Sequence, residues 1–156
     1  MFINKALNIF LCYFFLILTC CDNQKIAHFY ETIPHEGWHK NHSVEFEFNI
    51  SESTNNIDFL IGLRNNNDYR YSNIFFFIEI ISPDGSLEID TAQFLLAEPD
   101  GRWLGKGVGP IKHLLLSYKE NNEIQSGNYK VNISHGMRDS LLLGIEDIGF
   151  RLEKAN

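Results

Sequence analysis

Hydrophobic and polar residues alternate along several segments of the chain, which indicates half-buried β-strands. Between Val44 and Ile50, apolar residues occupy every second position and are separated by Glu45, Glu47 and Asn49. A period of two is the pattern of a strand with one face on a hydrophobic core. The same pattern recurs, over shorter or less regular stretches, in residues 59–63, 87–89, 129–133 and 145–152. We therefore expect a strand in each of these segments.

A longer apolar run covers Ile74–Ile81 and predicts a central strand that is covered on both faces. Its Phe and Ile content favours a strand over a helix. The turn residues Pro83-Asp84-Gly85 follow it, so this run and residues 87–89 are expected to form a hairpin. The segment Ile111–Tyr118 is compatible with a strand or a short helix, and its periodicity does not decide between them.

The whole pattern predicts about eight strands, with turn residues between them and no amphipathic helix. Such a chain is typical of an all-β fold, and we expect a single jelly-roll-like β-sandwich. The domain is expected to occupy residues 43–156. Residues 21–42 are mostly polar and contain Pro34 and Gly37, so they are predicted to be a tether.

The N-terminus has the features of a lipoprotein signal. Lys5 provides a positive charge, and the apolar stretch Ala6–Leu18, too short for a comfortable membrane span, ends at Cys20 and Cys21. Bacterial lipoprotein signals are cut directly before the cysteine that carries the lipid. Cys21 is the preferred lipid attachment site, because an aliphatic residue lies three positions before it, and Cys20 is the alternative.

The signal predicts where the mature protein works. We expect residues 1–20 to be removed as a signal peptide. Acyl chains such as palmitate would then hold the domain in the cell envelope, at the outer membrane or a periplasmic face rather than in the cytoplasmic membrane. The membrane is therefore an expected partner, reached through the lipid anchor.

Composition and charge exclude several classes of function. Without residues 1–20 the chain keeps 136 of its 156 residues and loses Lys5, so its net charge changes from −7 to −8. An acidic domain of this kind is not expected to bind nucleic acid. With Cys21 acylated, no thiol is left for a disulfide framework or for nucleophilic chemistry. No cofactor and no small-molecule substrate are expected.

The sequence contains no convincing metal or catalytic motif. His35, His39 and His42 lie close together, but no Cys or acidic ligand stands near them at a fixed spacing, so we expect exposed loop histidines and no metal site. The acidic residues between positions 84 and 100 fall at turns and on polar strand faces, and no Gly-x-Ser-x-Gly elbow is present. We therefore predict no catalytic residues and no enzyme. His135 is interpreted as a surface residue or a hydrogen-bonded polar group.

Two unusual segments are candidates for binding a protein partner. Arg64–Asn73 is rich in Asn and carries tyrosines and arginines, which are frequent at interface hot spots, although a solvated hairpin loop explains the same composition. Gly101–Pro110 holds four glycines around Trp103 and lacks the ending of a phosphate-binding loop. Trp103 is either a core residue or an interface anchor. We select four possible partner-binding residues: Arg64, Tyr69, Tyr71 and Trp103.

The order of motifs along the chain is typical of one family. After the lipoprotein signal come Trp38, the strand Val44–Phe48, Leu63-Arg64-Asn65, Tyr69-Arg-Tyr71-Ser-Asn73, Pro83-Asp-Gly85, Asp90-Thr91, Gly101-Arg-Trp103-Leu-Gly105-x-Gly107, Gly127-x-Tyr129, Met137-Arg138 and Leu143-Gly-Ile-x-Asp147-Ile-Gly149-x-Arg151. Taken together, these residues resemble the GldH-type gliding-motility lipoproteins over essentially the whole mature chain. The sequence departs from the family pattern at Arg70, where Pro is expected, at Phe75-Phe76-Phe77, where Trp is usual, and at His135-Gly136, where Gln-Ala is usual.

The resemblance implies a non-enzymatic envelope lipoprotein. Such a protein would be an accessory or scaffold component of the gliding machinery, which works with a secretion system across the outer membrane. The expected partners are other envelope proteins of that machinery. The resemblance supports acylation at Cys21 and carries over no catalytic residues. The alternative function is a glycan-binding β-sandwich lipoprotein, since jelly-roll sandwiches with exposed aromatic residues often bind sugars.

Overall fold

The computed structural model describes residues 25–155. The predicted signal peptide (residues 1–20) and Cys21 lie outside the described residues. The described part contains ten strands: β1 (Lys25–Thr32), β2 (Trp38–His39), β3 (Val44–Ile50), β4 (Thr54–Asn65), β5 (Asn73–Ile81), β6 (Leu87–Leu95), β7 (Lys112–Ile124), β8 (Gly127–His135), β9 (Leu141–Leu142) and β10 (Ile145–Lys154). Ile111–Tyr118 therefore belongs mainly to a strand, and the predicted hairpin is formed by β5 and β6.

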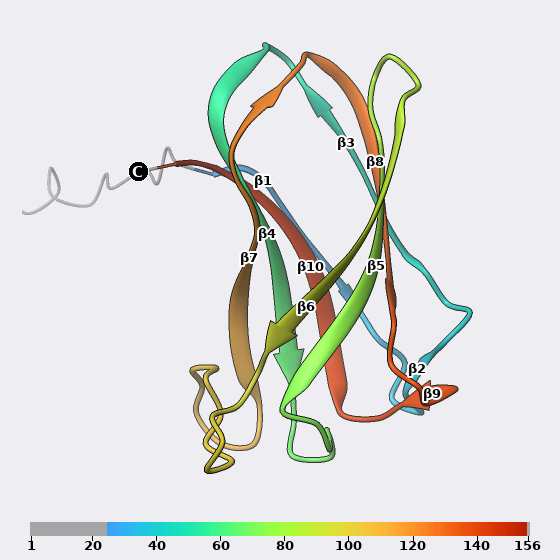
Figure 1. The fold of residues 1–156 in the computed structure, drawn as a ribbon, viewed down its shortest axis with the longest axis vertical. Coiled ribbons are helices and arrows are strands. Elements are labelled where there is room, and N and C mark those ends of the chain that lie inside the picture. The colour runs from blue at the N-terminus through green and yellow to red at the C-terminus, as the bar shows by residue number, and fades with distance from the viewer. Residues whose placement is uncertain (1–24, 156) are drawn as a thin grey trace, which may run out of the picture.

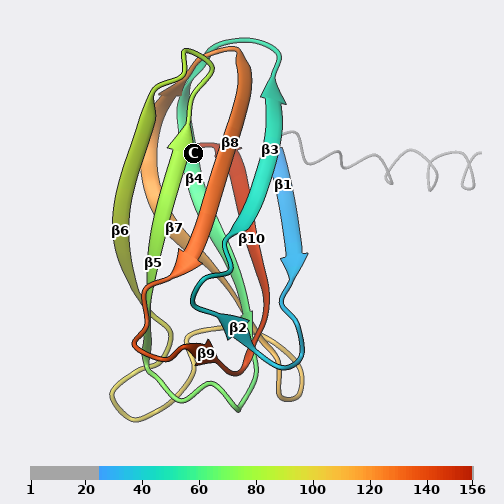
Figure 2. The ribbon, with the colours of Figure 1, turned by 90° about the vertical axis from the view of Figure 1, so that its right-hand side faces the viewer.

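The strands form two four-stranded sheets that pack against each other (Figures 1 and 2). Sheet I has the order β1-β10-β4-β7, sheet II has the order β3-β8-β5-β6, and β2 pairs only with β9. If the eight long strands are counted in chain order, with β2 and β9 left out, sheet I has the order 1-8-3-6 and sheet II has the order 2-7-4-5. This is the two-sheet order of a jelly roll. The predicted all-β jelly-roll sandwich is confirmed.

The core lies between the two sheets and is rich in aromatic side chains. The alternation in β3 places Val44, Phe46 and Ile50 inside, as predicted. Phe48 lies at the border, where its ring stacks on those of Tyr129 and Phe150 at centroid distances of 5.5 and 5.9 Å. These contacts fasten β3 to its neighbour β8 and to β10 of the opposite sheet.

The outer face of β5 is open, which corrects one expectation. The alternate residues of this strand beginning at Ile74 are buried, but Phe77 keeps 44% of its surface exposed. A sandwich has two layers only, so no third layer covers the outer side of sheet II. The apolar outer residues of β5 therefore face solvent.

The predicted tether is wrong for residues 25–42, because β1 and β2 belong to the folded domain. β1 is an edge strand that pairs with β10, and it carries apolar side chains on both faces. Ala27 and Phe29 pack against the core. Tyr30 points the other way and lies over Gly62 and Gly149, where any larger side chain would collide with its ring. A strand with apolar residues on both faces shows no clear alternation, which explains why the sequence pattern missed it.

Three connections gather at one end of the sandwich, called the loop end below. They are residues 66–72, 96–111 and 136–144. The last of them contains β9, which pairs with β2 at this end (Figure 1). Lys25 pairs with Glu153 at the other end of β1, so both ends of the described chain lie away from the loop end. The part of the chain that the structure describes contains no helix long and apolar enough to cross a bilayer.

Candidate partner-binding surface

The loop between β4 and β5 is held in place by polar contacts of its first residues. The Asn66 N–H donates to the Gly144 carbonyl at 2.9 Å, and the Asn66 side chain accepts from the Asp68 N–H at 2.7 Å. This second bond is an Asx turn, which explains why an Asn-rich segment suits a tight connection. The loop is thus joined to the connection before β10, and the two segments act as one surface.

Tyr69 is a core residue, which corrects its prediction as a partner-binding residue. Its side chain is 3% exposed, and its hydroxyl donates to the Asn73 carbonyl at 2.7 Å. Burial raises the pKa of this hydroxyl. The ring contacts Tyr71 edge-on and Trp103 at a tilt, with centroid distances of 5.8 and 6.4 Å. Tyr69 therefore supports the loop end from below and does not offer its ring to a partner.

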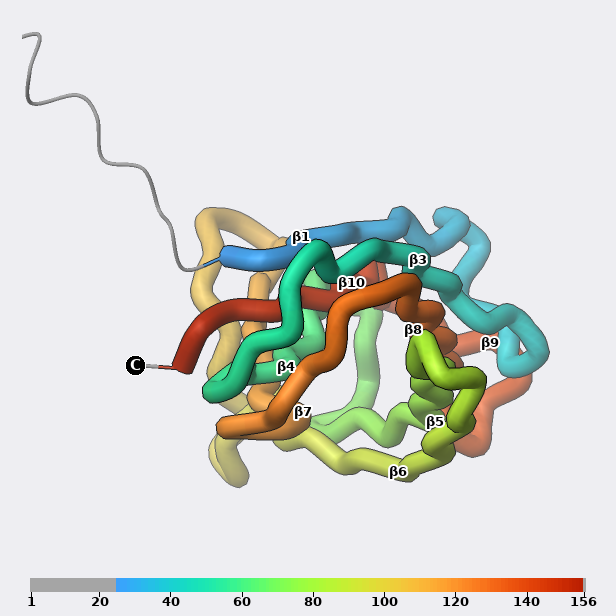
Figure 3. The backbone as a smooth tube through the Cα atoms, turned by 90° about the horizontal axis from the view of Figure 1, so that it is seen from above, coloured from blue at the N-terminus to red at the C-terminus, as the bar shows by residue number. Residues whose placement is uncertain are grey.

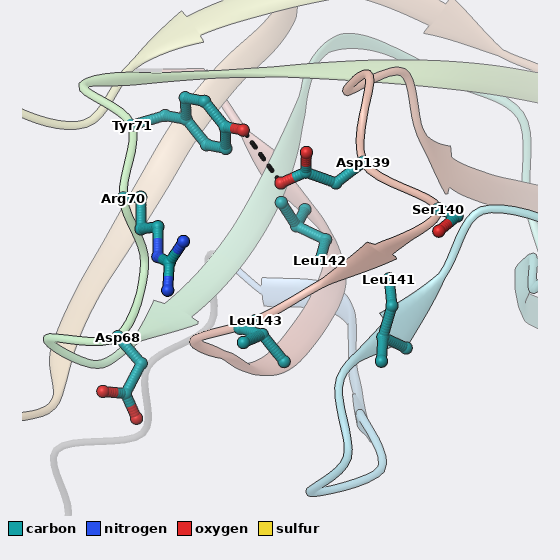
Figure 4. A pocket seen from close by; sticks show the side chains of 8 residues that line it. All are labelled: Asp68, Arg70, Tyr71, Asp139, Ser140, Leu141, Leu142 and Leu143. Atoms are coloured by element: carbon teal, nitrogen blue, oxygen red, sulfur yellow. Dashed lines mark hydrogen bonds between the residues drawn. The ribbon is translucent and has the colours of Figure 1, made fainter.

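Tyr71 lies at the surface and lines a cleft of about 290 Å³ (Figure 4). Its hydroxyl donates to Asp139 Oδ2 at 2.8 Å, and this hydrogen bond raises the pKa of the hydroxyl. Because Asp139 lies in the connection after β8, the bond joins the two walls of the cleft. The remaining lining residues are Asp68, Arg70, Ser140 and Leu141–Leu143.

The cleft combines an apolar side with charged residues. Leu141 and Leu143 are each 42% exposed, whereas Leu142 between them is buried. Asp68 and Arg70 lie on the opposite wall (Figure 4), and within residues 25–155 Arg70 forms no ion pair. Exposed aliphatic residues beside an unpaired Arg are typical of protein-binding surfaces.

A second recess of about 320 Å³ adjoins Tyr71 on its other side. It is lined by Phe75, Gly136, Met137 and Arg138. The Phe75 N–H points at Met137 Sδ at 3.4 Å, which fixes the Met side chain against the start of β5. Tyr71 is the residue that lines both recesses.

Trp103 is half-buried: part of its side chain packs against the core, and the rest lies at the surface. It pairs with Ala97 through a short β-bridge, and its ring packs against the core beside Tyr69. The Leu104 N–H donates to the Leu96 carbonyl at 2.9 Å, which folds the Gly-rich segment back on itself. Trp103 therefore holds the loop of residues 96–111 against the loop end.

Arg64 lies apart from the other selected residues. It is on the outer face of sheet I, where its Nη1 is 3.1 Å from Asp147 Oδ2. Asp147 is 8% exposed and also accepts from the Thr32 hydroxyl at 2.8 Å. Arg64 lines neither recess. The structure thus brings together Tyr69, Tyr71 and Trp103 but does not add Arg64 to them.

Sequence reasoning missed the other wall of the cleft, which comes from residues 139–143. The available signal was Leu141-Leu142-Leu143 directly after Asp139 and Ser140. In an extended segment, consecutive side chains point to opposite sides, so three adjacent leucines cannot all face one core. At least one of them had to be exposed.

The histidines near the loop end show no metal-binding arrangement. Residues 25–155 contain no group of three or more His, Cys, Asp or Glu side chains that could hold a metal ion. His35, His39 and His42 are all exposed, and His39 Nδ1 accepts from the Asn41 N–H at 3.1 Å. His35 and His42 lie in connections, whereas His39 belongs to β2.

The family model for the GldH lipoprotein matches residues 25–152, which is nearly the whole described domain. The chain belongs to the GldH lipoprotein family. It is 43% identical to a protein of Christiangramia forsetii described as a gliding motility lipoprotein GldH homolog, over 98% of this chain and 99% of that protein. It is 34% identical to the gliding motility lipoprotein GldH of Flavobacterium johnsoniae, over 89% of this chain and 91% of that protein.

Membership in the GldH family implicates the chain in gliding motility and associates it with the cell envelope. The names of the family and of both relatives describe a lipoprotein and not an enzyme. The GldH match begins at residue 25, where β1 begins. The family domain therefore includes the two strands that the sequence pattern had assigned to the tether.

Solved structures with a similar arrangement include two carbohydrate-binding modules. One is a CBM28 module specific for non-crystalline cellulose, with a TM-score of 0.44 and 8% identity over 81% of this GldH-family chain and 72% of the module. The other is a family 35 module from Clostridium thermocellum, with a TM-score of 0.38 and 12% identity over 85% and 91% of the two chains.

Proposed function

We propose that this protein is a lipid-anchored, non-catalytic scaffold component of the gliding-motility machinery and its associated secretion system. It binds another envelope protein through the loop end, with Tyr71, Leu141 and Leu143 at the centre of the contact. The observation that carries this proposal is the cleft between residues 68–71 and 139–143. Two half-exposed leucines beside a fixed tyrosine form the apolar centre that protein interfaces need.

The walls of the cleft are pre-organised, which favours a rigid protein partner. Tyr71 is bonded to Asp139, Asn66 is bonded to Gly144, and the Tyr71 ring packs on the buried Tyr69. Binding to such a surface costs little ordering of loops. The unpaired Arg70 at the rim suits an acidic group on the partner.

The predicted lipid anchor leaves this surface free. Cys21 precedes Lys25 by four residues, so even a fully extended connection spans only about 14 Å. β1 then runs about 23 Å from Lys25 to Thr32, toward the loop end. The acyl chains hold the domain close to an envelope membrane, at the outer membrane or a periplasmic face, while the loop end lies at the other end of the strand. Tethering of this kind raises the local concentration of the domain near membrane-bound partners.

Glycan binding is the alternative outcome and would need an aromatic platform. Trp103 and Tyr71 are the partly exposed aromatic residues of the loop end, and each is held by neighbouring side chains. Trp103 packs against Tyr69, and the Tyr71 hydroxyl is occupied by Asp139. The exposed Leu141 and Leu143 on the other side of the cleft favour a protein partner over a stacked sugar ring.

The proposal is tested with a cleft variant in a strain that lacks the wild-type protein. The double variant Leu141→Lys/Leu143→Lys places two charges in the apolar centre without touching the core. We expect it to be present at the normal level in the membrane fraction, to abolish colony spreading and to reduce secreted proteins in the culture supernatant.

Leu115→Lys is the matched control, because Leu115 is equally exposed, at 41%, but lies on β7 outside the cleft. It should spread normally. Normal spreading of the double variant would show that the cleft is not the partner-binding surface. If both variants spread and the soluble domain shifts its Trp fluorescence with polysaccharides, the glycan-binding alternative takes its place.

A further inference from the structure

β6 forms an unusually apolar free edge of sheet II. It pairs with β5 only, and Figures 2 and 3 show it at the border of the sheet with no strand beyond it. Its outward residues Leu87, Ile89 and Leu95 are 56%, 65% and 62% exposed. A nine-residue edge strand with exposed aliphatic residues is a ready template for another strand.

The hydrogen-bonding pattern shows which backbone groups of β6 face this edge. The Ser82 N–H donates to the Ser86 carbonyl, and residue 81 lies opposite residue 87. In an antiparallel pair the bonded positions alternate, so residues 88, 90, 92 and 94 bond to β5. The N–H and C=O groups of residues 87, 89, 91, 93 and 95 therefore point away from β5, toward the free edge of sheet II. One of these groups already has a partner: the Thr91 N–H donates to Oδ1 of the preceding residue, Asp90, at 2.7 Å, and both residues belong to β6.

We propose that two copies of this chain associate edge to edge through β6, antiparallel, with a two-fold axis at Thr91. In this arrangement the outward residues pair as Thr91 with Thr91, Ile89 with Gln93, and Leu87 with Leu95 of the second copy. The aliphatic ends of the strand then meet each other. The edge-facing backbone groups of both copies pair along the strand once the Thr91 N–H exchanges its bond to Asp90 Oδ1 for the Thr91 carbonyl of the other copy.

The acidic residues of β6 select this register. With the axis at Thr91, Glu88 faces Phe94 and Asp90 faces Ala92 of the other copy, so no two carboxylates are opposite each other. An axis at Asp90 would place that residue opposite itself, and an axis at Ile89 would place Glu88 opposite Asp90. Like charges directly opposite each other destabilise a strand pair. An axis at Ala92 would leave Leu87 without a partner.

The neighbouring strand β7 prepares the edge for this contact. Lys119 forms an ion pair with Glu88, and the Tyr118 hydroxyl donates to Asp90 Oδ2 at 3.2 Å. Both acids are thus directed toward the chain's own sheet I. Their charge is partly balanced before a second copy approaches, which reduces repulsion between two acidic domains.

The symmetry is compatible with anchoring both copies in one membrane. Residues directly opposite each other in an antiparallel pair have their side chains on the same face, so the two-fold axis is perpendicular to sheet II. Sheet I of both copies then lies on the same side, and β1 with Lys25 belongs to sheet I. Both chains would lead to the same membrane surface. The loop ends would point outward in opposite directions and stay free.

The register is tested by disulfide crosslinking of the full chain in isolated cell membranes. All three cysteines of the sequence lie at or before position 21, so Thr91→Cys adds a single thiol to the described domain. Directly opposed residues in a bonded pair are about 5.5 Å apart between Cα atoms, which a disulfide spans. Mild oxidation should convert Thr91→Cys into a covalent dimer at least tenfold more than the parent chain.

Two further measurements separate this dimer from random collision. Asn49→Cys, on the opposite edge strand of sheet II, should crosslink no more than the parent. Leu87→Cys and Leu95→Cys should not crosslink when either is expressed alone, because the two copies of the same residue would be about 27 Å apart. They should crosslink when expressed together, because Leu87 of one copy lies opposite Leu95 of the other. A Thr91→Cys yield no higher than that of Asn49→Cys, or failure of the mixed pair, overturns the proposal. Neither outcome depends on the cleft at the loop end.

Discussion

Gly144 is the residue that sets the shape of the candidate cleft. Its φ of +80° lies in the left-handed region, and a Cβ at this position would collide with the backbone of Tyr69 and Asp68. Any other residue would therefore separate the two loops that form the cleft walls. Gly85 has nearly the same φ of +81°, but an added Cβ there would meet nothing within 4 Å.

This pair of glycines supports a matched prediction. Gly85→Ala should cost about 1 kcal/mol in the free energy of unfolding, which is the strain of a left-handed alanine. Gly144→Ala should cost at least about 2 kcal/mol more, because it adds a steric collision. Urea denaturation of the two variants measures the difference, and equal costs would show that the loops do not touch as described.

His135 is a buried residue, which corrects its interpretation as a surface or fully hydrogen-bonded group. It is 1% exposed, and its Nε2 lies 3.1 Å from the Trp38 carbonyl. That carbonyl is an acceptor, so Nε2 carries the proton, and Nδ1 has no partner within the described residues. Burial lowers the pKa of His135 below 6.5, and Lys40 and His39 lower it further, while the hydrogen bond to Trp38 and the charge of Asp139 oppose this shift.

Stability should therefore decrease in mild acid. Below about pH 6.5 the unfolded chain binds a proton at this residue that the folded protein does not bind, so the free energy of unfolding falls as pH falls. The slope from one such group is at most about 1.4 kcal/mol per pH unit. His135→Gln should flatten the dependence of the urea midpoint between pH 7 and pH 5. The exposed His35→Gln should leave it unchanged, and an unaltered slope in His135→Gln would contradict the assignment.

At the scale of single residues, the sequence singled out two segments that the fold does bring together at the loop end, but it did not predict which of their side chains are exposed. Tyr69 and Tyr71 are two positions apart and chemically alike, yet one is buried and the other lines the cleft. The difference arises from the turn at Asn66 and from contacts with residues 139–144, more than sixty positions away. No local pattern contains that information.

The strands of the fold were predictable where one face meets the core and the other meets water. β3 fulfils this condition, and its alternation was clear. β10 was also predicted, at residues 145–152, but from a less regular pattern, because Ile148, Gly149 and Phe150 are all buried. Gly149 is covered on the outer side by Tyr30, so both faces of β10 are protected there and the period of two is lost. β1 was missed for the related reason that Tyr30 makes its outer face apolar.

Tyr30 should therefore be a main attachment of β1 to sheet I. Its ring crosses β10 and β4, and its hydroxyl lies 2.7 Å from His113 Nε2 on β7. Tyr30→Ala should lower the free energy of unfolding by about 2 kcal/mol through lost packing. Tyr30→Phe, which keeps the ring, should cost only about 1 kcal/mol for the hydrogen bond. Thermal or urea unfolding compares them, and a phenylalanine variant as weak as the alanine variant would contradict this account.

At the scale of the whole molecule, the sandwich was predictable from the count and spacing of strands, whereas the candidate cleft was not. The cleft combines residues from two connections that become neighbours only after both sheets have formed. The lipid anchor is the opposite case, because its prediction depends on a short local motif around Cys21 and on no folded structure.

The anchor gives a prediction for the whole chain. Cys21→Ala should move the protein out of the membrane fraction and impair colony spreading, because it removes the predicted site of the acyl chains that hold the domain at the membrane. Fractionation followed by immunoblotting measures this. Cys20→Ala serves as the control and should keep the protein in the membrane. Retention of Cys21→Ala together with loss of Cys20→Ala would move the attachment site to Cys20.

The most direct test of the account is site-specific photo-crosslinking in living, gliding cells. A photo-reactive amino acid replaces Leu143 in the cleft or, as the control, the equally exposed Leu115 on β7. We expect a discrete crosslinked product with another envelope protein from position 143 and none from position 115. The same product from both positions, or no product from position 143 in cells that still glide, would contradict a partner-binding surface at the loop end.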